Sequence, residues 1–486
     1  MYYGEAHDPE LGRVVVISTE ITAIRLYPAI PETLNELALG DFLILGSPLW
    51  LDKTCTVFSA IRLLGPGHRL LATAAGTQVV PYWDVPKNTT LIRYRTEQEY
   101  IDHYLALLTT AIRDRMRTDR MIISLSGGMD SSAIAAIATD LNQRGETNTA
   151  LAALVSVYDR IMPDTEAYYA GLVARKLKLD VDFVPQDQYR IVHPLPLYAQ
   201  PIQAYSRGGR EMGALLRAHG ELMLTGAGSD ETLRLTPLWD VLRYLSPAAA
   251  VALYAWLWRF QKRRPPLTGL LPYLSQFHPL PSHRPPPPMM QSPERYPQWL
   301  NPDFEREFQL KARWDQFWAF RPPAESMLQP NAYKALKQNV WSTITEPLEG
   351  LEFPPMGMVV PFLDLRMVAF TLALPPQPFN TRKQILRMAM RDRLPEEVLR
   401  RPKTPLGPLL RTMLTLPGAE WVDDWEPIPE LARSVIRSAI PKLAGADGSQ
   451  DFAPVRMRPL ALNAWLAHYR RPLEATPAHL PTRDAG

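Results

Sequence analysis

A short loop of serines, glycines and one acid is the first segment whose residue types could do chemistry. It follows the apolar run 121–123 and precedes the alanine-rich run 133–138, which predicts strand, loop and helix in that order. Glycines let the backbone approach an anion, and the loop amides with the helix N-terminus attract phosphate oxygens. Asp130 would hold a magnesium ion against the same phosphates. The alternative is a turn that caps an ordinary helix. The loop residues are Ser126, Gly127, Gly128, Asp130, Ser131 and Ser132.

A second glycine turn also ends in acids. The run 222–225 predicts a strand, and Gly226, Gly228, Asp230 and Glu231 follow it. Carboxyl ends of parallel strands meet at one edge of a sheet, so we expect Asp230 to meet Asp130 across one magnesium ion. Either acid alone would be typical of a solvated turn or a helix cap. Together they favour a metal-ligand role.

The bulk composition limits the class of protein. With 486 residues, 46% of them apolar, the chain can fill the cores of two or more domains. Its 53 basic and 50 acidic side chains give a net charge of only +3, which does not favour nucleic acid or an anionic membrane as a partner. The single cysteine, Cys55, excludes an intrachain disulfide and makes the cytoplasm the expected location. The longest apolar stretch, 247–258, is shorter than the roughly 20 residues of a membrane helix.

The pattern of apolar residues changes near residue 90. Residues 1–90 look β-rich, while the segment from Thr96 shows helical periodicity, so we place a domain boundary there and a second domain at 91–486. The Pro-rich segment 263–302 predicts an extended connection, serving either as a lid or as a passive linker. The strands expected in the first domain are Arg13–Ser18, Phe42–Leu45, Arg69–Ala72 and Thr77–Val80.

Strands and helices alternate in the first half of the second domain. This alternation predicts an α/β fold in which helices flank a parallel sheet and ligands bind at the carboxyl ends of the strands. The predicted elements are strands at 121–126, 151–158, 182–184 and 221–225, with helices ending near Arg144 and spanning Thr165–Lys178. The remainder of the chain, to about Tyr469, looks mainly helical.

The first loop resembles the Ser-Gly-Gly-x-Asp-Ser pyrophosphate loop of the ATP pyrophosphatase family. Three later motifs, in the same order and with similar intervals, resemble the C-terminal synthetase domain of the asparagine synthetase superfamily: Pro361–Asp364, Lys383–Arg387 and Leu394–Lys403. Near the start, Tyr2–Gly4 and Leu64–His68 are similar to the later part of that family's glutaminase domain. The resemblance implies an adenine nucleotide alpha hydrolase-like synthetase domain behind a truncated, degenerate Ntn glutaminase-like domain.

This resemblance also implies a reaction and its residues. Such enzymes cleave ATP to AMP and pyrophosphate with magnesium, adenylating a carboxylate that an amine then attacks. Asp130 and Asp230 would hold the ion, Ser156 and Val157 would offer backbone groups to adenine, and Lys403 would stabilise the reacting oxygens. The expected phosphate and nucleotide contacts are Ser126, Gly127, Gly128, Ser131, Ser132, Gly226 and Gly228.

Departures from the family pattern narrow the subfamily. A working glutaminase needs cysteine after the initiator Met, where this chain has Tyr2, so we expect no glutamine hydrolysis and a packing role for Cys55. Ala227 and Gly357 stand where β-lactam synthetases and asparagine synthetases keep groups that carry protons. The acceptor for the amine proton is therefore unassigned, with four candidates: Glu231, Glu346, Glu349 and Glu352.

The remaining branch is the lasso peptide cyclase, which adenylates an Asp or Glu side chain of a precursor peptide and closes a macrolactam with the peptide's N-terminal amine. Segments 295–304 and 400–406 look like parts of that group. The resemblance implies a precursor peptide as substrate, with a leader-peptide protease and a recognition protein as partners. Two alternatives remain open: an amide ligase acting on a small acid without glutamine, and a non-catalytic relative that binds nucleotide or peptide.

Overall fold

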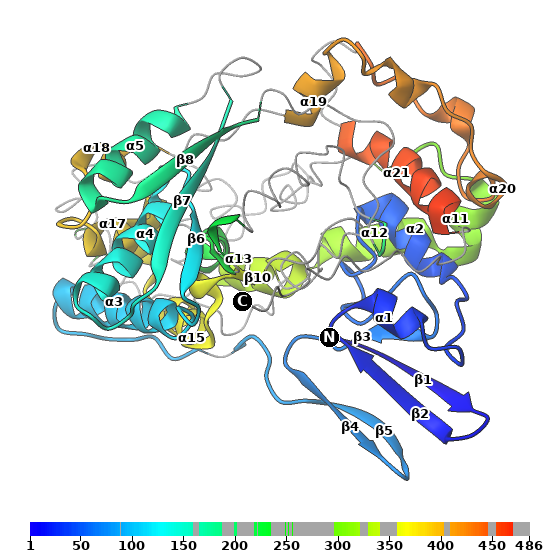
Figure 1. Ribbon diagram of the computed structural model, residues 1–486, viewed down its shortest axis with the longest axis horizontal. Helices are drawn as coiled ribbons and strands as arrows, with labels where there is room; N and C mark the ends of the chain where they lie inside the picture. The colour runs from blue at the N-terminus through cyan, green and yellow to red at the C-terminus, as the bar shows by residue number, and fades with distance from the viewer. Residues whose placement is uncertain are drawn as a thin grey trace, which may run out of the picture.

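The structure is a computed structural model in which two lobes lie side by side, one built on a parallel sheet and one mainly helical (Figure 1). Asn88 and several later segments are not among the residues that the structure describes. The described residues are 1–87, 89–158, 165–186, 199–201, 218–220, 222–234, 296–320, 329–340, 357–402, 409–445 and 453–469, with the single residues 248, 251 and 255.

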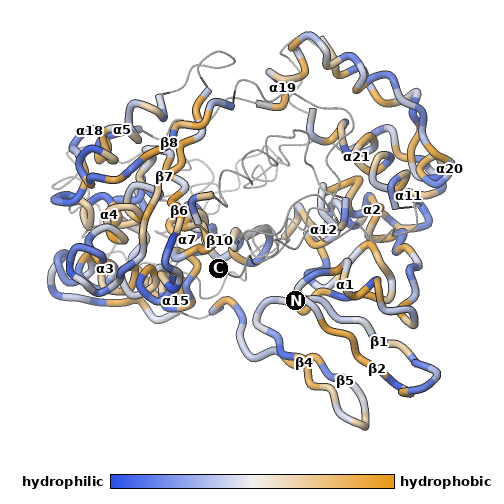
Figure 2. The backbone as a smooth tube through the Cα atoms, in the orientation of Figure 1, coloured by the Kyte–Doolittle hydropathy of each residue, from blue (hydrophilic) through white to orange (hydrophobic). Residues whose placement is uncertain are grey.

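A five-stranded, fully parallel sheet forms the centre of the first lobe, in the order β10-β9-β6-β7-β8. Strands β6 and β7 are central and carry apolar runs (Figure 2), as expected of strands covered on both faces. The sheet confirms the predicted α/β class. Its strands are β6 (Arg120–Ser124), β7 (Ala150–Val157), β8 (Asp180–Pro185), β9 (Leu222–Leu224) and β10 (Gly357–Val359).

The helices of this lobe begin close to the predicted positions. Helix α3 (Glu97–Arg113) is capped by Thr96, whose hydroxyl accepts a hydrogen bond from the Glu99 amide. Tyr104, Leu108 and Ile112 lie on its buried face, at the spacing that predicted the helix. The neighbouring helices are α4 (Met129–Gln143), α5 (Glu166–Leu177), α15 (Leu365–Ala373), α17 (Gln384–Ala389) and α18 (Glu396–Arg400).

The N-terminal residues form two small antiparallel sheets. Strands β1 (Tyr2–Asp8), β2 (Gly12–Ser18) and β3 (Ile61–Leu63) make one sheet, and β4 (His68–Thr73) pairs with β5 (Gly76–Pro81) in a hairpin that projects from the lobe (Figure 1). Three of the four predicted strands are therefore confirmed.

The fourth prediction was wrong, because Phe42–Leu45 is the end of helix α2 (Glu36–Leu45) and not a strand. Asn35 caps this helix by accepting a hydrogen bond from the Ala38 amide. All residues from 38 to 45 are buried, so the helix has no polar face. A short apolar run without such a face cannot be told from a strand by its period.

Helix α2 lies in the core of the second lobe, between segments distant in sequence. This core joins residues near the N-terminus to residues 299–318 and 413–466. Arg313 forms an ion pair with the fully buried Asp41, and the fully buried Arg458 donates hydrogen bonds to the carbonyls of Leu43 and Ile44 at the helix end. The longer helices here are α11 (Pro302–Phe308), α12 (Leu310–Ala319) and α21 (Ala453–Tyr469).

Several predictions fall outside the described residues. Among them are the apolar stretch 247–258, apart from the single residues 248, 251 and 255, and the Pro-rich segment up to residue 295. The end of the Pro-rich segment is described, and there Trp299 and Leu300 are buried in the core of the second lobe. Shorter helices are α1 (Ile21–Arg25), α7 (Ser229–Thr232), α13 (Pro330–Ala335), α16 (Pro376–Phe379), α19 (Leu409–Leu414) and α20 (Pro429–Ala432).

Candidate active site

The first glycine-rich loop connects β6 to α4 at the carboxyl edge of the sheet. Gly127 has a φ of +62°, and a Cβ atom there would lie 2.5 Å from the Ala170 amide nitrogen and 2.6 Å from Tyr169 Cβ. Only glycine combines this backbone conformation with such a close approach. The loop is thus packed directly against α5.

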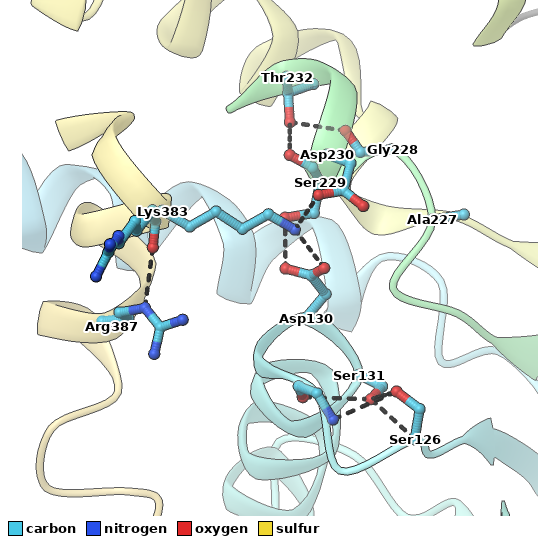
Figure 3. A network of polar contacts seen from close by, with 12 residues as sticks. Ser126, Asp130, Ser131, Ala227, Gly228, Ser229, Asp230, Thr232, Lys383 and Arg387 are labelled. Carbon is cyan, nitrogen blue, oxygen red and sulfur yellow. Dashed lines mark hydrogen bonds and ion pairs between the residues drawn. The ribbon is translucent and has the colours of Figure 1, made fainter. Parts of the chain in front are cut away.

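Hydrogen bonds inside the loop fix its shape. The Ser126 amide donates to Ser131 Oγ at 3.1 Å, and the Gly128 amide donates to Ser126 Oγ at 3.3 Å (Figure 3). Ser132 behaves differently from its neighbour, because its side chain is fully buried and its hydroxyl has no hydrogen-bond partner. The structure thus does not present Ser132 to a phosphate in the way that we expected from the sequence.

This difference yields a testable pair of variants. Ser131→Ala is expected to weaken MgATP binding about ten-fold, since it removes the acceptor that shapes the loop. Ser132→Ala is expected to change binding less than about two-fold, because no hydrogen bond is lost and an unsatisfied buried hydroxyl is removed. Isothermal titration calorimetry with MgATP measures both. Equal losses in the two variants would contradict the assignment.

The second glycine loop, between β9 and α7, touches the first. A Cβ atom on Gly226 would lie 2.8 Å from Asp130 Cβ and 2.9 Å from the Ser131 amide nitrogen. Gly228 has a φ of +84°, and a Cβ atom there would lie 2.5 Å from Leu363 Cγ. Both glycines are therefore needed for close packing, against α4 on one side and against the Pro361–Asp364 motif on the other.

The two predicted acids, Asp130 and Asp230, form ion pairs with the same lysine. Lys383 Nζ forms ion pairs with Asp130 and, at 2.8 Å, with Asp230 Oδ1 (Figure 3). Ser229 Oγ donates to Asp130 Oδ1 at 2.8 Å and orients that carboxylate. The lysine ammonium thus occupies the position between the acids at which the sequence predicted a cation.

The donor set is compatible with magnesium. Mg²⁺ commonly binds one or two protein carboxylates and completes its coordination with water and substrate phosphates. Asp130 and Asp230 supply two carboxylates that already share one cation, beside the glycine-rich loop. Within the described ranges, no group of three or more His, Cys, Asp or Glu residues could hold a metal ion by itself. The residues present therefore fit an ion that is shared with phosphates.

Lys383 is the main residue that sequence reasoning missed. The motif Lys383–Arg387 resembles the family pattern, but the sequence alone predicts no chemical role for its lysine. The lysine reaches the acids from a turn in which Arg382 and Lys383 have φ values of +51° and +56°. Each left-handed non-glycine residue costs about 1–2 kcal/mol, so the surrounding structure must hold this turn in place.

The residues predicted to meet adenine lie at the end of β7. The Val157 carbonyl accepts a hydrogen bond from the Gln186 amide beyond β8, while the Leu154 carbonyl faces the other side and accepts from Leu125. Backbone groups alternate in direction along a strand, so those of Ser156 face the glycine-rich loop. Ser156 is thus better oriented than Val157 to offer backbone groups to a nucleotide.

Ala227 and Gly357 do not lie together. Ala227 follows the carboxyl end of β9, whereas Gly357 pairs with Leu222 at the other end of that strand. Glu231 lies on α7, next to Asp230. Burial, and secondarily the negative charge of Asp230, raises the pKa of the Glu231 carboxyl. The remaining predicted positions, Lys403, Glu346, Glu349 and Glu352, lie outside the described residues.

Cys55 has the packing role that the sequence predicted. Its thiol accepts a hydrogen bond from Asn35 Nδ2 at 3.3 Å. Burial, followed by the negative charges of Asp52 and Asp41, raises the pKa of the Cys55 thiol to about 12. A thiol with this pKa stays protonated at neutral pH and is a poor nucleophile.

The fold and the site define an α/β protein in which a glycine-rich loop and two paired carboxylates meet at the carboxyl edge of a parallel sheet. The asparagine synthase family model matches residues 103–339 and 356–467, which is most of the chain. The chain therefore belongs to the asparagine synthase family.

Individual relatives are distant. Amidase chyE from Penicillium rubens is 26% identical over 205 residues, which make up 37% of this chain and 30% of that protein. The chain thus spans about a third of that relative's length. The solved structure of the U34-tRNA thiolase NcsA from Methanococcus maripaludis, with its 4Fe-4S cluster, matches at 12% identity. That match has a TM-score of 0.21 and covers 51% of this chain and 81% of the other.

Among the helices in the described ranges, none has the length and apolar character of a membrane span.

Proposed function

We propose that this protein is an AMP-forming amide ligase that closes a macrolactam in a precursor peptide, as a lasso peptide cyclase does. One observation carries the ligase part of the proposal. Asp130 and Asp230 converge on a single cation directly beside a loop whose glycines and amides suit phosphate. Binding a triphosphate at such an edge is what adenylation of a carboxylate requires.

The proposed reaction has two steps. In the first, an Asp or Glu carboxylate oxygen of the peptide attacks the α-phosphorus of ATP, and pyrophosphate leaves along the Ser126–Ser131 loop. Magnesium, when held by Asp130 and Asp230, would neutralise phosphate charge. In the second, the N-terminal amine attacks the acyl carbon, AMP leaves with the bonding electrons, and the amine gives up a proton. Holding amine and acyl-adenylate together replaces a bimolecular encounter.

Glu231 and Lys403 have proposed roles in the second step. Glu231 accepts the amine proton, a role supported by its position on α7 next to Asp230 and by burial that raises the pKa of its carboxyl. Lys403 stabilises negative charge on the reacting oxygens. The support for this role is that Arg401, two residues earlier in the chain, donates to the Ser126 carbonyl at 3.1 Å.

The proposed peptide substrate has two supports. Segments 295–304 and 400–406 are similar to lasso peptide cyclases, and Ala227 and Gly357 lack the side-chain groups that could take up a proton in β-lactam synthetases and asparagine synthetases. In the described part of the first segment, Trp299, Leu300 and Phe304 are buried in the helical lobe, which is a packing role. A leader-peptide protease and a recognition protein are the proposed partners.

The alternative function is a small-acid amide ligase, which the description of the matched family favours. One assay separates the two functions. AMP release and ATP–pyrophosphate exchange are measured with no acceptor, with aspartate plus ammonia, and with a linear precursor peptide that bears an internal Asp or Glu. We expect AMP only with the peptide, together with loss of one water from the peptide mass. AMP formed with aspartate and ammonia would favour the alternative, and no AMP with any acceptor would contradict both.

A further inference from the structure

Arg387 on α17 joins two segments of the site through their backbones. Its Nε donates to the Arg382 carbonyl at 2.9 Å (Figure 3), and its Nη2 donates to the Arg401 carbonyl at 3.1 Å. Its Nη1 donates to the Leu399 carbonyl. The guanidinium holds its donors in a rigid planar fork, so these contacts fix the turn before Lys383 relative to the end of α18.

Arg401 continues the connection to the glycine-rich loop. Its side chain is buried, and its Nη1 donates to the Ser126 carbonyl at 3.1 Å. The guanidinium lies 4.3 Å from the ring centroid of Tyr169 and 3.8 Å from Glu166 Oε1, both on α5. The Arg401 side chain is thus held by two contacts on α5 while it binds the loop.

The two arginines form one continuous chain of contacts. It runs from the Arg382 carbonyl through Arg387 to the backbone of Arg401, and through the Arg401 side chain to Ser126. One end precedes Lys383, whose left-handed backbone is not favoured locally and must be held from outside. The other end is part of the loop that bonds the side chain of Ser131.

We propose that Arg387 and Arg401 are positioning residues that hold Lys383 against Asp130 and Asp230 and fix its distance from the glycine-rich loop. The inference rests on the proposed function, because it assumes that MgATP binds at this loop. Neither arginine needs to touch the nucleotide. Their effect passes through Lys383, and this dependence separates positioning from a general contribution to stability.

The test is a double-mutant cycle with MgATP as the probe in calorimetry. Arg387→Met is expected to weaken MgATP binding about ten-fold in the wild-type background, as the loss of charge-assisted hydrogen bonds would do. In a Lys383→Met background, the same change is expected to weaken binding less than about two-fold, because its target is already gone. If Arg387→Met weakens MgATP binding by the same factor in both backgrounds, the two residues act independently and the inference is overturned. Arg387→Lys, which keeps the charge without the fork, is a milder second variant expected to give an intermediate loss.

Arg437 provides a matched control in the other lobe. It donates to the carbonyl of Trp425 at 3.1 Å and stacks on that residue's ring at 4.7 Å, so it too ties backbone segments together. Arg437→Met is expected to lower the melting temperature much as Arg387→Met does, while MgATP binding stays unchanged. Equal weakening by both variants would overturn the inference. So would unchanged binding by Arg387→Met alongside normal wild-type binding. A wild-type protein that binds no MgATP would overturn the proposed function as well.

Discussion

Asp130→Asn and Asp230→Asn are each expected to lower ATP turnover by roughly 100-fold or more, the scale on which single electrostatic contacts act in transition states. Asparagine keeps the size of the side chain, and at position 130 it can still accept the hydrogen bond from Ser229. Asparagine lacks the negative charge that pairs with Lys383 and that would bind a magnesium ion. The measurement is the initial rate of AMP release against magnesium concentration, with the acceptor that supports wild-type turnover.

Asp140→Asn is the matched control for Asp130→Asn. Asp140 lies on the same helix, its side chain is 28% exposed against 24% for Asp130, and it forms ion pairs with Arg144 and Arg393. Its loss is expected to change turnover less than about two-fold, since it lies three turns from the site. Because Asp130 and Asp230 bind the same cation, the double variant Asp130→Asn/Asp230→Asn is expected to turn over ATP no more slowly than the slower single variant. Equal losses at positions 130 and 140 would contradict the assignment.

The parts of the site that could be predicted depend on local sequence signals. Gly127 and Gly228 follow apolar strand runs and adopt positive φ, and each is followed by the acid that it helps to place. Strand, turn and helix signals of this kind are contained in a few consecutive residues. For the same reason the α/β class and most strand positions could be predicted without knowledge of the tertiary structure.

The parts that could not be predicted depend on packing between distant segments. Helix α2 is buried on all sides, so its sequence carries no helical period. Consecutive helical residues point about 100° apart, and only the packed loop decides that Ser131, and not Ser132, bonds Ser126. Lys383 reaches the acids through a left-handed turn that its sequence does not favour. Tertiary contacts therefore determine which side chains complete the site.

Lys383→Met is expected to have opposite effects on the two ligands of the site. In the free protein the ammonium competes with magnesium for Asp130 and Asp230, because it is paired with both carboxylates. Its removal is expected to tighten magnesium binding in the absence of ATP by about ten-fold, which corresponds to about 1.4 kcal/mol of lost competition. With nucleotide present, the missing charge is expected to reduce ATP turnover by roughly 100-fold. A purely structural lysine would weaken both functions together.

Thermal unfolding gives an independent measurement of the same competition. Without its lysine, the site holds two adjacent carboxylates that have lost the cation they share, so the variant is expected to unfold at a lower temperature in chelator than the wild type does. Added magnesium is expected to raise the melting temperature of Lys383→Met more than that of the wild type, because tighter binding to the folded state stabilises it more. Lys337→Met, which breaks the ion pair of Lys337 with Asp84 at 2.6 Å, is the control and is expected to leave the magnesium response unchanged. A magnesium response of Lys383→Met no larger than that of the wild type would show that the lysine and the ion do not share the two acids.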